Sequence, residues 1–175
     1  RIKDKKEDKK LTDHYKRTNA AVLRSMEMNF RKSITFSFAG IYCPTFRIGA
    51  KSLFDHGSSN IFCDYVDMNI LLGIICSKLI RCQSRVNINH SVNFGVDDVK
   101  EIPLEIKSNV RIKELVLRII DKQKCGLRYD YMSHEQKEID KLVYGMFRLS
   151  NDDIREVETW YARRYPKLAR FVDIK

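Results

Sequence analysis

One apolar segment constrains the fold of this chain more than any other. The run "NILLGIICSKLI", from Asn69 to Ile80, is the longest apolar stretch of the 175 residues. It is too short to cross a bilayer, and Lys78 interrupts it. Its apolar residues recur at helical spacing and form a wide stripe. The sequence therefore predicts one helix over 67–85, with Asp67 as its N-cap and its stripe in the protein core.

The residues before this helix have the pattern of a small β region. In "SITFSFAGIYCPTF", Ile34, Phe36 and Phe38 alternate with smaller residues, which is typical of a strand. The segments "SLFD" and "NIFCDYV" predict further short strands, separated by turns at glycines, at Pro44 and at "DHGSSN". Residues 1–32 are strongly charged, and we expect a helix there from Asp13 onwards.

The residues after the helix begin with a polar connector and continue as helices. The connector "HSVNFGVDDVKEIPLEI", residues 90–106, has a bend predicted at Asn93 and Gly95. Three segments with helical stripes follow, and the last two should form an angled pair across a short turn. Their expected start and stop residues are Ser108, Ser133 with Gln136, Ser150 with Asp153, and finally Pro166.

These elements together predict an α+β fold, with a small mixed or antiparallel β region followed by an α-helical C-terminal part. We divide the chain into a basic helical lead-in from an upstream domain (1–32), an α/β core (33–106) and a helical tail (107–175). Hydrophobic residues make up 43% of the chain, which is enough to bury a core.

The amino-acid composition indicates what kind of partner the chain could bind. The net charge of +10 favours a polyanion, with nucleic acid ahead of an anionic membrane surface. The opening run "RIKDKKEDKK" has no apolar segment after it, so we expect no signal peptide and interpret it as the edge of a longer cytoplasmic protein. The five cysteines form no CxxC pair and the four histidines stand alone, so we expect reduced thiols and no metal site.

The common catalytic motifs are missing from the sequence. It has no glycine-rich phosphate loop, no GxSxG, no HExxH and no Asn-Pro-Pro-aromatic tetrapeptide. Asp98, Glu105 and Lys107 match the acidic residues and lysine of a metal-dependent nuclease, but a solvated loop explains them as well. We therefore expect no catalytic residue within the chain.

The final helix pair allows two interpretations. It could be a DNA-binding helix-turn-helix in which Arg155, Arg163 and Arg164 contact DNA. Alternatively, its apolar residues form an ordinary packing face. That face would consist of Ile154, Val157, Trp160 and Tyr161.

Four sequence blocks, in order, resemble a known family. "ITFSFAG" with "PTFRIGAKSLFDHGSSNIF" looks like the start of the target-recognition domain of type IIG restriction-modification enzymes and BREX-type adenine DNA methyltransferases. "ILLGIICSKLI" is similar to the family's "LLGxLNSKL" helix, and "VNFGVDDVKEIPL" to its "xNFxxGDIxxIPI" segment. "IDKLVYGMFRLSNDDIREVETWYARRYP" resembles its closing "IDxLVYxLYGLxxxEIxxVE" tail. Three positions depart from these patterns: Cys76 stands for the usual Asn, and Asp97 and Arg148 for the usual Gly.

The resemblance implies a module that binds duplex DNA and recognises a short sequence. S-adenosylmethionine and the methyl-transfer site would lie in an upstream domain, so no cofactor is expected within these residues. The partners implied are double-stranded DNA and that methyltransferase domain, with no membrane. Two other hypotheses stay open: a specificity-type module that docks a methyltransferase through its helices, and the metal-dependent nuclease.

The candidate DNA-binding residues fall into two groups. Asn, Ser and Arg side chains recognise base edges, and dispersed cations contact phosphates. One group belongs to the β region: Thr35, Ser37, Arg47 and Lys51. The other belongs to the end of the apolar helix and the loop after it: Lys78, Arg81, Arg85, Asn87, Asn89, His90 and Asn93.

Overall fold

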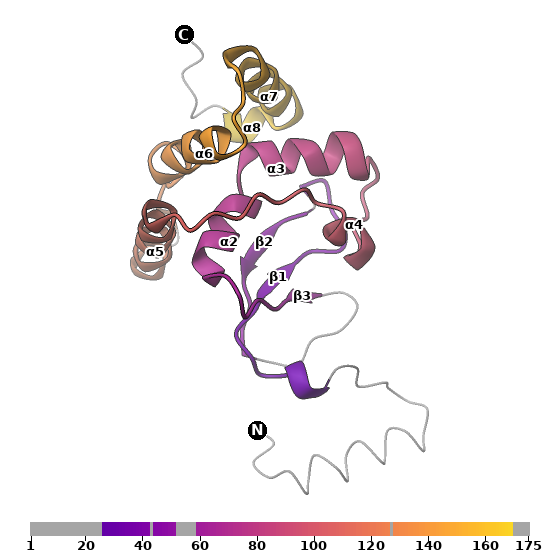
Figure 1. Cartoon of the computed structure of the whole chain (residues 1–175), viewed down its shortest axis with the longest axis vertical. Coiled ribbons are helices and arrows are strands. Elements are labelled where there is room, and N and C mark those ends of the chain that lie inside the picture. Colours follow the sequence, from indigo (N-terminus) through magenta and orange to yellow (C-terminus); the bar gives the residue numbers. More distant parts are fainter. Residues whose placement is uncertain (1–25, 43, 52–58, 127, 170–175) are drawn as a thin grey trace, which may run out of the picture.

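The computed structural model describes residues 26–42, 44–51, 59–126 and 128–169. Within these ranges the chain has a small antiparallel sheet followed by mostly helical structure, so the α+β prediction is confirmed (Figure 1). Among the described helices, none combines the length and the apolar character needed to cross a membrane. The helix expected from Asp13 lies largely outside the described residues, which begin with a short 3-10 turn at Met26–Met28.

The sheet has three strands in the order β2-β1-β3. β1 (Ile34–Phe36) pairs with β2 (Phe46–Ile48) on one side and with β3 (Asn60–Ile61) on the other. All three residues of β1 are buried, including the polar residue Thr35. Its hydroxyl can be buried because it donates a hydrogen bond to the carbonyl of Ser59 at 3.1 Å. The strand predicted as far as Phe38 ends two residues earlier, at Phe36. The strand predicted at "SLFD" lies outside the described residues.

The single helix predicted over 67–85 is wrong, because the chain breaks it at Cys76 and Ser77. α2 (Met68–Ile75) is followed by α3 (Lys78–Gln83) and by a π-helical turn, Ser84–Ile88. Ser77 caps α3 by accepting a hydrogen bond from the amide of Ile80 at 3.4 Å. The N-cap predicted at Asp67 is confirmed by its 2.9 Å bond to the amide of Asn69.

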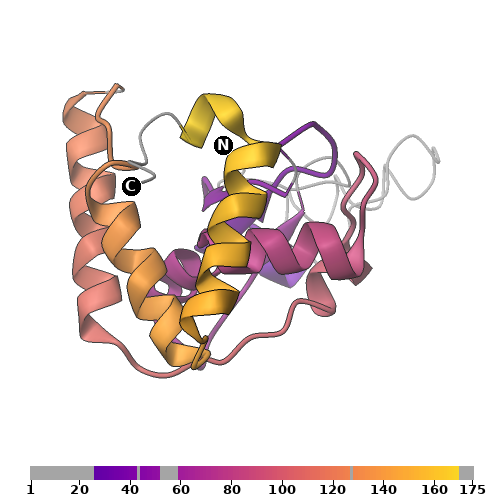
Figure 2. The same cartoon turned by 90° about the horizontal axis from the view of Figure 1, so that it is seen from above.

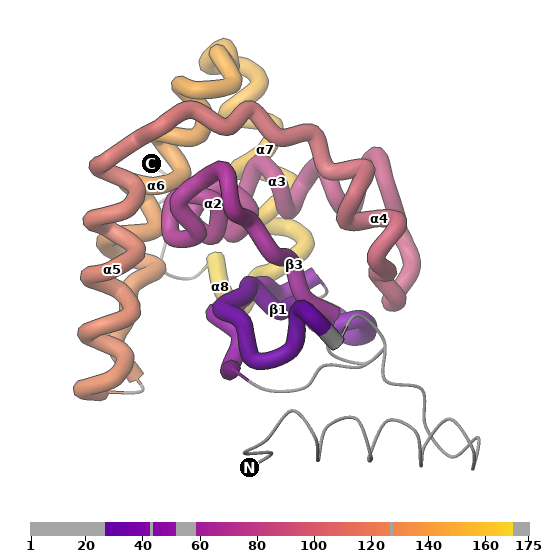
Figure 3. Tube along the Cα trace, turned by 60° about the horizontal axis from the view of Figure 1, so that its bottom comes forward, coloured from indigo at the N-terminus to yellow at the C-terminus, as the bar shows by residue number. Residues whose placement is uncertain are grey.

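The polar connector contains a short helix and a long crossing. α4 (Val96–Lys100) begins after Gly95, whose amide donates to the Asp98 carboxylate at 2.6 Å. Asp98 thus accepts hydrogen bonds from the Gly95 amide and from the Asn89 side chain, the latter at 3.0 Å. From α4 the chain runs across α3 and α2 to α5, a path visible in Figures 1 and 3.

Four helices form the tail: α5 (Val110–Cys125), α6 (Glu135–Met146), α7 (Asn151–Arg164) and α8 (Pro166–Ala169). Asn109 rather than Ser108 caps α5, bonding the amide of Ile112 at 3.1 Å. The capping box predicted at Ser133 is also wrong, since His134 precedes α6 without a side-chain cap. The capping box of Ser150 is confirmed. Pro166 ends α7 as expected, but it also begins α8.

The core lies around α2. α5 packs closely along α2, and the sheet covers another side of it (Figure 2). Gly73 permits this approach, because a Cβ at that position would lie only 2.5 Å from the Cγ2 of Ile112. α6 and α7 meet across a short turn and both contact α3, so α3 joins this helix pair to the rest of the fold.

Candidate nucleic-acid interface

Two loops that are far apart in sequence are joined in space. Ala39, in the connection between β1 and β2, forms an antiparallel bridge with Asn93. The amide of Gly40 donates to the carbonyl of Val92 at 3.0 Å, and the amide of Phe94 to that of Phe38 at 2.6 Å. The Phe94 side chain is fully buried beneath this junction. We call the combined surface the loop ridge, made of residues 38–42 and 87–94.

Arg85 fixes the shape of the loop ridge from inside. Its side chain is buried, and its guanidinium donates to the carbonyls of Ser91 and His90, the latter at 3.3 Å. The His90 ring closes the arrangement through a 2.9 Å bond between its Nδ1 and the Arg85 carbonyl. A buried guanidinium that is held by backbone carbonyls of the loop favours one fixed shape for this segment.

The polar residues of the ridge differ in what they offer. Asn89 has a structural role, since its amide donates to Asp98 at 3.0 Å and its oxygen accepts from the amide of Ser91 at 2.8 Å. Asn87, His90 and Asn93 are exposed. Within the described part of the chain, the Asn87 amide donates to Gln83 alone, one turn earlier. These three residues therefore leave polar groups accessible on the ridge, although Nδ1 of His90 is held by the Arg85 carbonyl.

The candidates of the β region lie on and beside β2. Arg47 and Lys51 are exposed. Ser37 is half-buried, with its hydroxyl 2.5 Å from that of Thr45. Arg81, from α3, donates to the carbonyl of Tyr42 at 3.0 Å and lies 5.3 Å from the centre of the Tyr165 ring.

Three of the predicted DNA-binding side chains are not on the surface. Thr35, Lys78 and Arg85 are at most 7% exposed. Each is engaged by protein groups, so we leave all three out of the proposed interface. The residues that stay are Arg47, Lys51, Asn87, His90 and Asn93 on the surface, with Ser37, Arg81 and Asn89 partly exposed.

Lys78 belongs instead to a buried network between α3, α6 and α7. Its ammonium lies 2.7 Å from Glu158 and 3.9 Å from Asp140, and it also faces the Tyr161 ring. Oδ1 of Asp140 accepts from the backbone amide of Lys78 at 3.0 Å, whereas its Oδ2 is buried without a hydrogen bond. Burial raises the pKa of Asp140 to about 6. The sequence pattern gave no sign that this lysine is enclosed.

The proposed nuclease residues have other partners. Asp98 caps α4, and Glu105 forms an ion pair with Lys107 that lowers the pKa of the Glu105 carboxyl. Over the described ranges, no cluster of His, Cys, Asp and Glu has the arrangement of a metal site. α7 uses Val157 and Tyr161 as buried packing residues, which agrees with the packing interpretation of the final helix pair.

An aromatic cluster beside Arg81 was not anticipated from the sequence. Tyr165 stacks on Tyr42 with ring centres 5.7 Å apart, and Trp160 and Tyr161 pack against the same ring. The sequence pattern placed Trp160 and Tyr161 on the packing face of one helix and gave no role to Tyr165. Their contact with Tyr42, which comes from the loop ridge, depends on the tertiary fold.

Comparison with known proteins leaves the family open. No protein-family model matches the chain, and no curated protein matches it.

Proposed function

We propose that this chain is the DNA target-recognition module of an adenine-N6 DNA methyltransferase or a type IIG restriction-modification enzyme. The observation that carries the proposal is the loop ridge, where exposed Asn87, His90 and Asn93 stand on a backbone held by buried Arg85. Sequence recognition needs polar side chains kept in fixed positions, because a mobile loop loses affinity when it is ordered on binding.

The chemistry of the exposed residues suits duplex DNA. Asparagine amides can form paired hydrogen bonds with adenine, and an imidazole can donate to or accept from base edges. Arg47 and Lys51 are free to contact phosphates, and the net charge of +10 favours long-range attraction to a polyanion. In this proposal the ridge recognises bases and the cations beside β2 hold the backbone.

The structure also gives physical reasons for several motif residues of the resemblance. Lys78 and Asp140 belong to two different blocks, and the backbone amide of Lys78 donates to the Asp140 carboxylate at 3.0 Å. Arg148 stands where the family pattern has Gly, and its φ of 55° lies in the left-handed region that favours glycine. Phe94 and Ile102, from a third block, are buried. These contacts support the resemblance as a shared fold.

In this proposal the chain binds DNA and performs no chemistry. An upstream domain of the same cytoplasmic protein would hold S-adenosylmethionine and methylate an adenine extruded from the duplex. The cofactor and the catalytic residues belong to that domain.

Selection from a pool of duplexes with a randomised centre tests the proposal. We expect the chain to enrich a short motif and to bind duplex DNA with an affinity that falls steeply with salt. Replacing Asn87 and Asn93 together by alanine should relax one or two motif positions, at about 1–3 kcal/mol each. Asn151→Ala, an exposed asparagine on α7, is the matched control and should leave the motif intact.

Two results would contradict this function. One is a pool that shows no enrichment together with undetectable binding at low salt. The other is a motif that persists unchanged in the double alanine variant, because the ridge would then not recognise bases.

A line of exposed apolar residues favours a second function, docking of another domain. Leu104 and Ile106, in the crossing segment, are 41% and 38% exposed, and Val110 at the start of α5 is 65% exposed. A docking module should co-elute with the methyltransferase domain encoded with it, and Leu104→Asp with Val110→Asp should abolish co-elution without changing DNA affinity. Co-elution that survives both substitutions would exclude this surface.

A further inference from the structure

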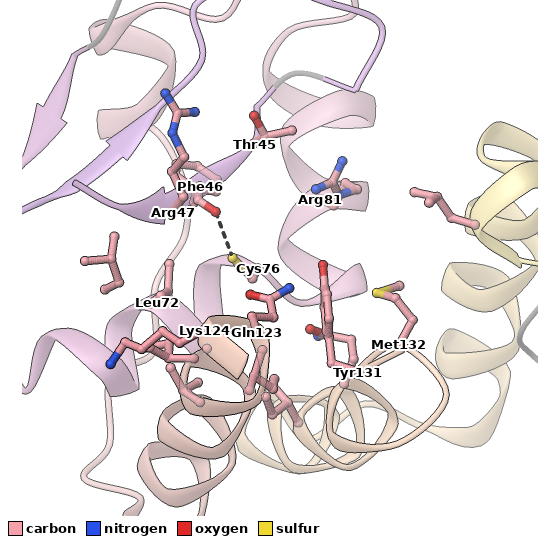
Figure 4. A pocket seen from close by; sticks show the side chains of 18 of the residues that line it. Thr45, Phe46, Arg47, Leu72, Cys76, Arg81, Gln123, Lys124, Tyr131 and Met132 are labelled. Carbon is pink, nitrogen blue, oxygen red and sulfur yellow. Dashed lines mark hydrogen bonds between the residues drawn. The ribbon is translucent and has the colours of Figure 1, made fainter. Parts of the chain in front are cut away.

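A cavity of about 570 Å³ lies between the sheet and the helical tail, on the side of α2 where β2 approaches α5 (Figure 4). Its size falls in the range of small-molecule sites. Most of its wall is apolar. The side chains that give this character come from β2, α2, α5 and α6: Phe46, Leu72, Val116, Ile119, Ile120 and Ile139.

A small set of polar groups converges on one side of this cavity. Arg81 lines it together with Tyr131, Tyr161 and Cys76, and Figure 4 shows the Tyr131 phenol directed towards Arg81. The charge of Arg81 influences the pKa of all three neighbours, so its guanidinium lies close to each of them. Among the described residues, neither phenol oxygen has a hydrogen-bond partner.

These neighbours are hydrogen-bond donors at neutral pH. Burial raises the pKa of Tyr161 to about 12 and that of Cys76 to about 11, and it also raises the pKa of Tyr131. All three groups therefore keep their protons. The Cys76 thiol already donates to the carbonyl of Phe46 at 3.6 Å, which leaves the two phenols available to an incoming acceptor.

The charged side chains that line the cavity are all positive. No Asp or Glu belongs to its described lining, whereas Arg47, Arg81 and Lys124 do. Lys124 forms an ion pair with Asp121 at 3.2 Å. Among the described residues, Arg81 has no ion pair and contacts the carbonyl of Tyr42 and the face of the Tyr165 ring. An uncompensated guanidinium beside an apolar space attracts an anion, since Coulomb attraction is stronger away from bulk water.

We propose that this cavity binds a small organic anion whose oxyanion is held by Arg81, Tyr131 and Tyr161 while its apolar body fills the space against α5. The cavity shares Arg47 and Arg81 with the proposed DNA interface, but the proposal rests on the cavity and its donors alone, so it stands whether or not the chain binds DNA. The oxyanion can be a carboxylate, a sulfonate or a phosphate ester, because each accepts hydrogen bonds from the same donors.

The probe for the test is 8-anilinonaphthalene-1-sulfonate, an aromatic anion whose fluorescence rises in apolar surroundings. We expect saturable binding to the folded chain, weakened about tenfold by Arg81→Met and less by Tyr131→Phe. N-phenyl-1-naphthylamine has the same aromatic body without the sulfonate, and its affinity should be unchanged by Arg81→Met. Arg155→Met, at an exposed site on α7, is the control variant, and circular dichroism verifies that each variant is folded.

Three outcomes would overturn the proposal. Equal affinity of the anionic probe for the wild type and for both substituted chains would show that the donors do not hold the oxyanion. An equal loss of affinity for the anionic and the neutral probe in Arg81→Met would show that Arg81 only shapes the cavity and does not bind the oxyanion. Absence of binding to the full chain, with binding by a chain that ends at Ala169, would assign the cavity to the chain's own residues 170–175.

Discussion

Replacing Lys78 by methionine tests the buried network that joins α3 to the helical tail. The substitution keeps most of the apolar stem but removes the ammonium that lies 2.7 Å from Glu158. It leaves Asp140, which is 2% exposed, without its nearest cation. The Glu158 side chain is 32% exposed and can be hydrated, so most of the loss arises at Asp140.

The expected magnitude follows from these exposures. Breaking a buried ion pair by removing one partner costs about 3–5 kcal/mol. Hydration of Glu158 and protonation of Asp140 reduce the penalty, so we expect a decrease of about 3 kcal/mol in the free energy of unfolding. For a chain of this length that loss corresponds to a melting temperature about 6–12 °C lower.

Urea denaturation followed by circular dichroism measures this loss. Lys141→Met removes an exposed lysine from α6 and should change stability by less than about 0.5 kcal/mol. The double variant Lys78→Met with Asp140→Asn should lose less free energy of unfolding than the two single variants lose together, because the two residues interact. If Lys78→Met were as stable as Lys141→Met, the buried network would not hold the tail, and our reasoning would be refuted.

Four further substitutions, arranged in three tests, have clear expectations. Because burial raises the pKa of Asp140 from its ordinary value of 3.8 to about 6, ionising it costs more in the folded chain, and its stabilising contribution is lost as the pH rises across this range. The stability of the wild type relative to Asp140→Asn should therefore fall between pH 4 and pH 7 in urea titrations, and a flat difference would contradict the burial argument. Gly73→Ala places a Cβ against Ile112 and should destabilise by about 1–3 kcal/mol, whereas Gly145→Ala, in open space on α6, should stabilise by up to about 1 kcal/mol; equal effects in thermal melts would refute this packing argument. Arg148→Gly relieves the left-handed backbone and should raise the melting temperature, and a lower value would show that this conformation is not strained.

Local patterns predicted the elements that depend on neighbouring residues. The N-cap at Asp67 and the capping box of Ser150 rest on side chains within one helical turn, and both are present. The strand at Ile34–Phe36 follows from alternation alone. The cap predicted at Ser108 failed because the adjacent Asn109 takes that position. The cap predicted at Ser133 failed because α6 begins one residue later, after His134, whose side chain does not cap it.

Features set by distant contacts were not predictable. The apolar stripe runs through Cys76 and Ser77 without interruption, so nothing in it marks the break between α2 and α3. The backbone amide at the start of α3 is satisfied by Asp140, 62 residues later in the sequence. For the same reason the sequence misplaced two candidate side chains: Lys78 and Arg85 were expected on the surface, and tertiary partners keep both inside.

The central claim is that a rigid loop ridge recognises DNA sequence, and the Arg85→Met variant tests it most directly. The measurement is the ratio of affinities for the selected duplex and for a scrambled duplex of equal length, by fluorescence anisotropy at fixed salt. Without the guanidinium bonds to Ser91 and His90 the ridge loses its fixed shape. We predict that the ratio falls about tenfold or more while affinity for the scrambled duplex changes little, since phosphate contacts remain. An unchanged ratio in a folded Arg85→Met chain would contradict the account.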